Sequence, residues 1–385
     1  MYNTTMYQGL CALIAAAAAL SAACSTKNTT GPAPPPGFTL TPVTISGDAG
    51  STFGVLDPSL AYAAGAAAGG LAYSSVPAQG QGAVHTRVAQ STDGGATWTF
   101  LTDVNVATAR TIATTDTSVC HAASCGGTWV HEVPSLTVDS TDPNASRRYK
   151  LFTHSYFVTS GGTLELTYGV IALYTAPALS GPWSAETRLL GWDSPSTASD
   201  SGVAQNITHD PALAGVSNCL LLTEPGAQAR GTTLDLAVGC LWFTGAKFPI
   251  DIRLLRSTDH GATWSFVTTL VDTTGANFLG SDRAQINGAD LFTAGGKYYL
   301  LADPHGAGGA YVGCVELEFS NITTGALVQV AGGPEARRQY QAPTGVAWTP
   351  CAAAPGAPQA GILMGVVNLS VPPPFRIVAT KQGPP

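Results

Sequence analysis

Short apolar runs alternate with turns rich in Gly, Asp and Pro along most of the chain. The runs at 84–90 and 250–256 each lead into a short turn and then into a second run, at 99–101 and 265–270. Brief runs bounded by turn residues are typical of strands, and two of them around a short Asp/Gly turn predict a β-hairpin. The pattern therefore predicts an all-β protein.

One octapeptide pattern, S-x-D-x-G-x-T-W, forms the turn of both hairpins, at 91–98 and 257–264. The Asp carboxylate can accept backbone N–H bonds within its own turn, and the glycine can adopt a positive φ. The Trp that begins the outgoing strand offers a large apolar face for packing. We therefore expect Asp93 and Asp259 to stabilise the turns and to take no part in catalysis.

This octapeptide resembles the Asp-box, and the chain accordingly resembles the sialidase-type β-propeller superfamily. The resemblance implies a propeller and an exo-sialidase-like glycosidase. Sialidases bind the substrate carboxylate with three arginines, the first in an F/Y-R-I-P motif, whereas residues 375–378 read F-R-I-V and lie near the end of the chain. Specificity for sialic acid is therefore not predicted, although several arginines could supply guanidinium groups: Arg253, Arg256, Arg283, Arg337 and Arg338.

A longer repeat predicts the number of blades. Pro58, Pro134 and Pro211 stand in similar contexts at intervals of roughly 76 residues, as expected of an array of one β unit. We divide the chain into five four-stranded units, the last of which lacks a strand. The segment Phe38–Ile45 is a spare strand that could complete it and close the ring, which protects the strand edges. Five blades is the prediction and six, as in sialidases, is the alternative.

The G-P-W turn at 181–183 also resembles the five-bladed glycosidases that act on arabinans and xylans, over three residues only.

The first 37 residues indicate export. An apolar, Ala-rich run over 9–23 precedes Cys24, which resembles a bacterial lipoprotein signal. We expect a signal peptide at 1–23, lipidation of Cys24, a Pro/Gly-rich tether at 24–37 and one domain at 38–385. This predicts a protein of the outer membrane or cell surface that meets the membrane only through its lipid; a cleaved secretory signal is the alternative.

The amino-acid composition limits the classes of partner that the protein is expected to bind. Charged residues make up 11% of the chain and the net charge is −7, which argues against a nucleic-acid partner. We expect a monomer. The six cysteines that remain after Cys11 and Cys24 are an even number, as expected for disulfides in an exported protein. Proximity in sequence predicts the pairs Cys120–Cys125, Cys219–Cys240 and Cys314–Cys351.

Several acids and histidines are predicted to share one face of the propeller. In a four-stranded blade, the start of the first strand and the end of the second lie on the same face. First strands supply Asp57, His131–Glu132 and His209–Asp210; second strands supply His154, Glu224, Asp303 and His305.

Glycoside hydrolysis uses two carboxylates, one protonated and one ionised. We expect Glu132 to be the general acid and Asp57 or Asp210 to be the base or nucleophile. The histidines, Glu224 and Asp303 are candidates for binding substrate. Asp-Pro is also an ordinary turn pair, so a structural role for Asp57 and Asp210 remains the alternative.

The sequence thus predicts an exported glycoside hydrolase, or a catalytically weakened relative, that acts on glycans. The alternative is a non-catalytic propeller that binds a carbohydrate or a protein. No cofactor and no dedicated metal site are predicted, although a central Ca²⁺ is compatible with the carboxylates.

Overall fold

The computed structural model describes residues 40–63, 66–78, 80–113, 124–191, 202–244, 248–306, 311, 313–341, 347–368 and 370–380. These residues form a mostly β structure with a few short helical segments. Cys24, the predicted signal peptide, the tether and the first two residues of the expected spare strand lie outside them. Among the helices in these ranges, none has the length and apolar character needed to cross a membrane.

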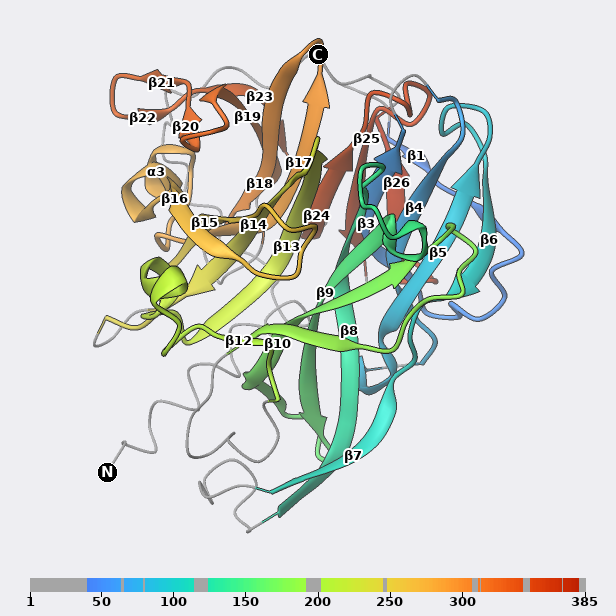
Figure 1. The fold of residues 1–385 in the computed structure, drawn as a ribbon. Helices are drawn as coiled ribbons and strands as arrows, with labels where there is room; N and C mark the ends of the chain where they lie inside the picture. Colours follow the sequence, from blue (N-terminus) through green and yellow to red (C-terminus); the bar gives the residue numbers. More distant parts are fainter. Residues whose placement is uncertain are drawn as a thin grey trace.

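Most strands belong to groups of antiparallel neighbours, numbered here 1 to 5 along the chain (Figure 1). Group 1 contains β3 (Gly54–Tyr62), β4 (Gly69–Val76), β5 (His85–Ser91) and β6 (Trp98–Asp103). Group 2 contains β8 (Ser124–Val138), β9 (Tyr149–Thr159), β10 (Leu164–Ala176) and β11 (Thr187–Gly191), with β7 (Thr108–Ala113) beside β8.

Group 3 contains β13 (Leu221–Arg230), β14 (Thr233–Leu241), β15 (Ile250–Ser257) and β16 (Ser265–Val271). Group 4 contains β17 (Ile286–Ala294), β18 (Lys297–Pro304), β19 (Gly313–Asn321) and β23 (Ala336–Gln341). Group 5 contains β24 (Ala347–Ala353), β25 (Ile362–Val367), β26 (Phe375–Ala379) and the N-terminal β1 (Thr41–Pro42).

The first strand of each group packs against the first strands of the groups before and after it. β3 contacts β8, β8 contacts β13, β13 contacts β17, β17 contacts β24, and β24 contacts β3 again. Apolar clusters fill the space between neighbouring sheets; Leu60 and Leu71 of group 1, for example, share a cluster with Leu363 and Ile377 of group 5. The last strands, red in Figure 1, consequently lie beside the blue first ones.

The N-terminal segment joins the last group to the first. β1 pairs antiparallel with β26, with Thr41 opposite Ala379, as the sequence predicted for this segment. A few residues later β2 (Ile45–Ser46) pairs parallel with β6, with Ile45 opposite Trp98. The segment therefore covers edges of two groups that lie at opposite ends of the sequence.

Both octapeptides form the tight turns that their residues predict. Asp93 Oδ1 accepts the Thr97 backbone N–H at 3.0 Å, and Asp259 Oδ1 accepts the Thr263 N–H at 2.9 Å. Each carboxylate also accepts a bond from the serine that opens its octapeptide, and each tryptophan is only 2% exposed. These contacts account fully for both acids as turn residues.

One strand assignment made from the sequence is wrong. The third unit does not begin at His209–Asp210: these residues precede a 3₁₀ helix, η4 (Pro211–Val216), and the first strand is β13. Asp210 is the N-cap of η4, where its side chain accepts the Ala212 N–H at 2.9 Å. In group 4, β19 pairs with β18 on one side and with β23 on the other, and β20 (Ala326–Leu327) also pairs with it.

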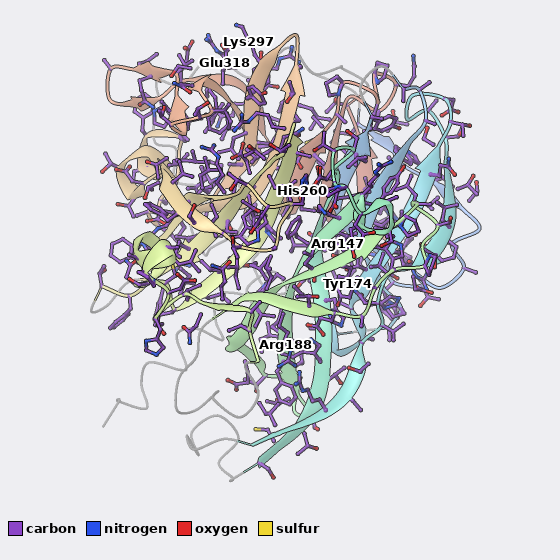
Figure 2. All side chains as sticks on the ribbon, in the orientation of Figure 1. Arg147, Tyr174, Arg188, His260, Lys297 and Glu318 are labelled. Carbon is purple, nitrogen blue, oxygen red and sulfur yellow. A yellow bond between two sulfur atoms is a disulfide. The ribbon has the colours of Figure 1, made fainter. Side chains whose placement is uncertain are left out.

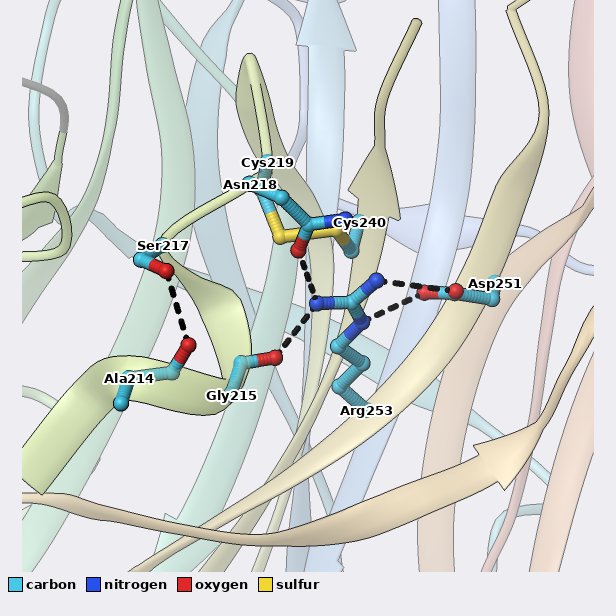
Figure 3. The surroundings of a disulfide bond; sticks show 8 residues. All are labelled: Ala214, Gly215, Ser217, Asn218, Cys219, Cys240, Asp251 and Arg253. Carbon is cyan, nitrogen blue, oxygen red and sulfur yellow. Dashed lines mark hydrogen bonds and ion pairs between the residues drawn. A yellow bond between two sulfur atoms is a disulfide. The ribbon is translucent and has the colours of Figure 1, made fainter. Parts of the chain in front are cut away.

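Two of the predicted disulfides are present. Cys219 is bonded to Cys240 within group 3, and Cys314 is bonded to Cys351 across groups 4 and 5. Cys125 is also disulfide-bonded, while Cys120 lies outside the described residues. Figure 3 shows how the first bridge lies beside Arg253, which donates to Asn218 Oδ1 at 2.6 Å and to the Gly215 carbonyl of η4, and pairs with Asp251.

Deleting residues 38–46 tests the role of the N-terminal segment. The deletion leaves the edges of β26 and β6 without partners, and unpaired edges promote association between chains. We expect a lower melting temperature and oligomers in size-exclusion chromatography, compared with a variant that lacks only residues 1–37. A monomeric deletion variant with the control's melting temperature contradicts this role.

Candidate active site

The first strands of groups 1 to 4 are interrupted at equivalent positions. Their ladders shift register in four places: between Leu56 and Ser59, Glu132 and Ser135, Thr223 and Gly226, and Asn287 and Asp290. A bulge of this kind bends a strand and redirects its side chains. These four strands and β24 form one ring of contacts, so the bulges lie at equivalent places around that ring.

The bulges carry an unusual backbone conformation. Asp57, Val133 and Glu224 have φ angles of 51°, 49° and 48°, and each is followed by a proline. Positive φ is strained for a residue with a Cβ, and such strain is found preferentially at functional sites. Proline has no N–H to donate to the ladder, so it is compatible with a bulge.

Four carboxylates converge at the centre of this ring. Asp57, Glu224 and Asp303 are 2%, 9% and 0% exposed, and Glu132 is half-buried. Burial, followed by the charges of Glu224 and Asp57, raises the pKa of Asp303 well above its ordinary value. Burial also raises the pKa of Glu132. Since the pKa of Asp303 responds to two of the other acids, these carboxyl groups lie within electrostatic reach of one another.

Glu224 has the pKa best suited to acid catalysis. Burial raises its pKa to about 7 and the negative charge of Glu132 raises it as well, while hydrogen bonds from Tyr311 and from the Gly288 backbone oppose both. A carboxyl group with this pKa is about half protonated in neutral solution and can give up its proton there. Its Oε2 atom is buried and has no hydrogen-bond partner among the described residues.

Two tyrosines hold two of the acids. Tyr156 Oη donates to Glu132 Oε2 at 2.5 Å, and Tyr311 Oη donates to Glu224 Oε1. Tyr156 comes from β9 of the same group as Glu132, whereas Tyr311 follows β18 and reaches across from group 4 to group 3. Neither tyrosine was predicted from the sequence, because no spacing relates them to the acids that they contact.

Two of the four proposed histidines face this centre. His154 is 4% exposed and packs against Tyr156, with ring centroids 4.9 Å apart, while His305 is 6% exposed and packs against Tyr311 at 4.5 Å. Burial lowers the pKa of both to about 3, so both are neutral at physiological pH. Within the described part of the chain, His154 Nε2 and both ring nitrogens of His305 have no hydrogen-bond partner.

The other two histidines have different surroundings. His131 precedes Glu132 in β8, so its side chain points to the opposite side of the strand. There its Nδ1 lies 2.8 Å from Ser155 Oγ and 3.1 Å from Tyr174 Oη, which indicates a structural role. His209 is exposed beside η4.

The structure therefore corrects part of the predicted site. Asp210 and His209 do not join the other acids, because the residues after them form η4 instead of an inner strand. Glu224 takes the position expected of Asp210, and it lies in a first strand rather than at the end of a second. A Glu-Pro pair in a strand-like run, comparable with Asp57-Pro58, is the signal that could have identified it.

Two clusters of potential metal ligands occur among the described residues, and neither suits a metal. Asp303 lies beside Cys314 and Cys351, whose sulfurs are already bonded to each other. Asp139, Asp142 and His260 surround the buried ammonium of Lys150, which is 2.6 Å from Asp142 Oδ2. The Lys150 charge occupies the position that a cation would take.

No protein-family model matches the sequence, and no curated protein matches it either. Among solved structures, the chain is similar to the arabinanase Arb43A of Bacillus subtilis, with 14% identity, coverage of 85% of this chain and 95% of that one, and a TM-score of 0.46. It is also similar to the family 117 glycoside hydrolase Zg3597 of Zobellia galactanivorans, with 13% identity, 90% coverage of each chain and a TM-score of 0.49.

The Hadza microbial sialidase Hz136 matches at 12% identity over 81% of this chain and 53% of its own, with a TM-score of 0.44. The TM-scores of these three structures are all below 0.5.

The raised pKa of Glu224 predicts a pH-dependent stability. Between its ordinary value of 4.5 and about 7, the folded chain binds this proton while the unfolded chain does not. The free energy of unfolding therefore falls as pH rises through that window. Glu224→Gln should unfold at a higher temperature than the wild type at pH 8, by the equivalent of roughly 3 kcal/mol, with no difference at pH 4.

Thermal unfolding of both proteins across pH 4–8 checks this prediction. The matched control is Asp282→Asn, which neutralises an exposed carboxylate near the same site. A difference between Glu224→Gln and wild type that is the same at all pH values contradicts it.

Proposed function

We propose that the chain is an exported glycoside hydrolase built as a five-bladed β-propeller. Each group of strands is one blade, and the ring of contacts between first strands supports closure, with β1 as the outer strand of the last blade. The domain is tethered to the cell envelope through a lipid on Cys24. One observation carries the function: equivalent bulges of three successive inner strands bring Asp57, Glu132 and Glu224 to a common buried centre.

The three acids have different roles in this proposal. Glu224 is the general acid, because it is protonated near neutral pH and has one oxygen without a partner. Asp57, at the equivalent bulge two blades away, is the base or nucleophile. Glu132 lies on the strand between them and keeps the pKa of Glu224 high through its charge. Environments that separate the pKa values of neighbouring carboxyls are typical of this chemistry.

This assignment moves the general acid from Glu132, as predicted from the sequence, to Glu224. Both acids accept a hydrogen bond from a tyrosine, but Glu132 is half-buried whereas Glu224 is only 9% exposed, so Glu132 is better suited to holding a charge. The unpartnered atoms of His154 and His305 are suited to binding the hydroxyls of a sugar ring.

The arginines favour a neutral sugar over a sialoside. A guanidinium that binds a substrate carboxylate must be unoccupied and near the centre. Arg283 lies within electrostatic reach of His305, and Arg147 within reach of Asp142. Ten other arginines have partners elsewhere in the structure, as Arg188, labelled in Figure 2, has over Trp129. The others with such contacts are Arg87, Arg110, Arg148, Arg230, Arg253, Arg256, Arg337, Arg338 and Arg376.

In this proposal Asp57 and Glu132 are ionised, and one guanidinium does not offset two negative charges, so the site should repel an anionic sugar.

The proposal is tested with the purified domain and a panel of chromogenic pyranosides, furanosides and a sialoside. We expect hydrolysis of a neutral glycoside. Glu224→Gln should lower kcat by a factor of about 100 or more, as loss of a general acid typically does. Glu132→Gln should lower it less and should move the basic limb of the pH profile downward, because the charge that raises the pKa of Glu224 is lost.

Asp210→Asn is the matched control and should retain wild-type activity, since Asp210 caps η4 away from the centre. Fastest turnover of the sialoside contradicts the substrate class. Saturable binding of a glycoside without turnover indicates the alternative, a carbohydrate-binding module, and wild-type turnover by Glu224→Gln removes this residue from catalysis.

A further inference from the structure

The contact between Tyr311 and Glu224 makes the two oxygens of this carboxyl group unequal. Oε1 accepts the hydrogen bond from Tyr311 Oη, whereas Oε2 is buried and has no partner among the residues that the structure describes. In a neutral carboxyl group the carbonyl oxygen accepts hydrogen bonds better than the hydroxyl oxygen, so the oxygen that faces a donor is the less favourable site for the proton. The proton of neutral Glu224 therefore belongs on Oε2.

Tyr311 is itself held in place. Its ring packs edge-to-face against His305, with centroids 4.5 Å apart and an angle of 72°, and its backbone forms an antiparallel bridge with His305. The backbone N–H of His305 donates to the Gln285 carbonyl at 3.0 Å. Burial raises the pKa of Tyr311 well above its ordinary value, so the phenol remains a hydrogen-bond donor at physiological pH.

We propose that Tyr311 is a positioning residue that holds Oε1 of Glu224 and leaves Oε2 as the oxygen that gives its proton to the substrate. This inference rests on the proposed function. In the step, the O–H bond at Oε2 breaks and the proton passes to the glycosidic oxygen as its bond to the anomeric carbon breaks. Asp57, or a water that it deprotonates, forms the new bond at that carbon, and Glu224 becomes a carboxylate that Tyr311 stabilises.

Other titratable groups also act on Glu224, so the effect of Tyr311 has to be separated from theirs. They come from three other blades: Asp57 on β3, Glu132 on β8, His154 and Tyr156 on β9, and Asp303 and His305 at the end of β18. Removing the phenol hydroxyl leaves all of them unchanged. The carboxylate form of Glu224 then loses a donor while the surrounding negative charges remain, so its pKa must rise.

The experiment titrates Glu224 directly, by carboxyl ¹³C NMR of protein labelled at glutamate, with Glu224→Gln to assign the signal. Tyr311→Phe should move the Glu224 titration upward by about one pH unit, or tenfold in the protonation equilibrium. Replacing Tyr311 by 3-fluorotyrosine, a stronger donor of nearly the same shape, should move it downward. The basic limb of the kcat profile should follow both shifts, and kcat of Tyr311→Phe should fall about tenfold.

The matched control is Tyr73→Phe, which removes a buried phenol donating to a different carboxylate, Asp48 Oδ2, at 2.8 Å. It should lower the melting temperature without moving the Glu224 titration or the pH profile.

An unchanged Glu224 titration in both Tyr311 variants overturns the inference, whatever happens to activity. If Tyr311→Phe does not fold, the 3-fluorotyrosine protein still decides it by the direction of its shift. Titrations that move as expected in a protein that hydrolyses none of the glycosides contradict the proposed function alone, because the hydrogen bond would then set the proton position in a binding site.

Discussion

The close approach of the inner strands is the constraint on which the rest of this structure depends. Each first strand contacts two others, so its backbone is covered on both sides and its polar groups need partners. Side chains just after the bulges supply some of them: Ser59 Oγ accepts the Leu136 N–H at 2.9 Å, and Ser135 Oγ accepts the Ala227 N–H at 2.7 Å. The bulge thus fastens one strand to the next and turns its own acid inward.

Burying carboxyl groups in this way opposes folding unless hydrogen-bond donors stabilise their charge or protons neutralise it. Asp57, Glu224 and Asp303 are almost inaccessible to solvent, and the charged form of a buried carboxyl is disfavoured. Tyr156 and Tyr311 each provide a donor, and raised pKa values provide the protons. Acid–base catalysis on a sugar also requires a set of carboxyl groups of which only some are ionised. The burial that opposes folding therefore also produces the ionisation states that this chemistry needs.

The octapeptide turns have a structural role and lie away from the candidate site. In the first turn, Ser91 pairs with Gly69, and Gly69 pairs with Tyr62, the last residue of β3. This turn therefore lies beside the end of β3 that is farther from the bulge. There Asp93 and Asp259 are occupied by their own turns, and hydrogen bonds from Thr97 hold the pKa of Asp93 at about 2. The most conspicuous acids in the sequence are therefore structural, and the less conspicuous ones form the candidate site.

Local sequence determined the strands and hairpins, the two octapeptide turns and the pairing of Cys219 with Cys240, because each depends on residues close together in the chain. The alternation of strand direction was also sufficient to place Asp57, Glu132, His154, Asp303 and His305 on one face. Asp-Pro at 210–211 was ambiguous, since an acid before proline suits both a strand bulge and a helix N-cap.

Only tertiary structure resolved that ambiguity. Leu221–Arg230 pairs with β14 and packs between β8 and β17, which makes it the inner strand and brings Glu224 to the centre. Tyr311 reaches Glu224 across 87 residues of sequence. Such contacts depend on how the sheets pack around the centre, and no pattern along the chain carries that information.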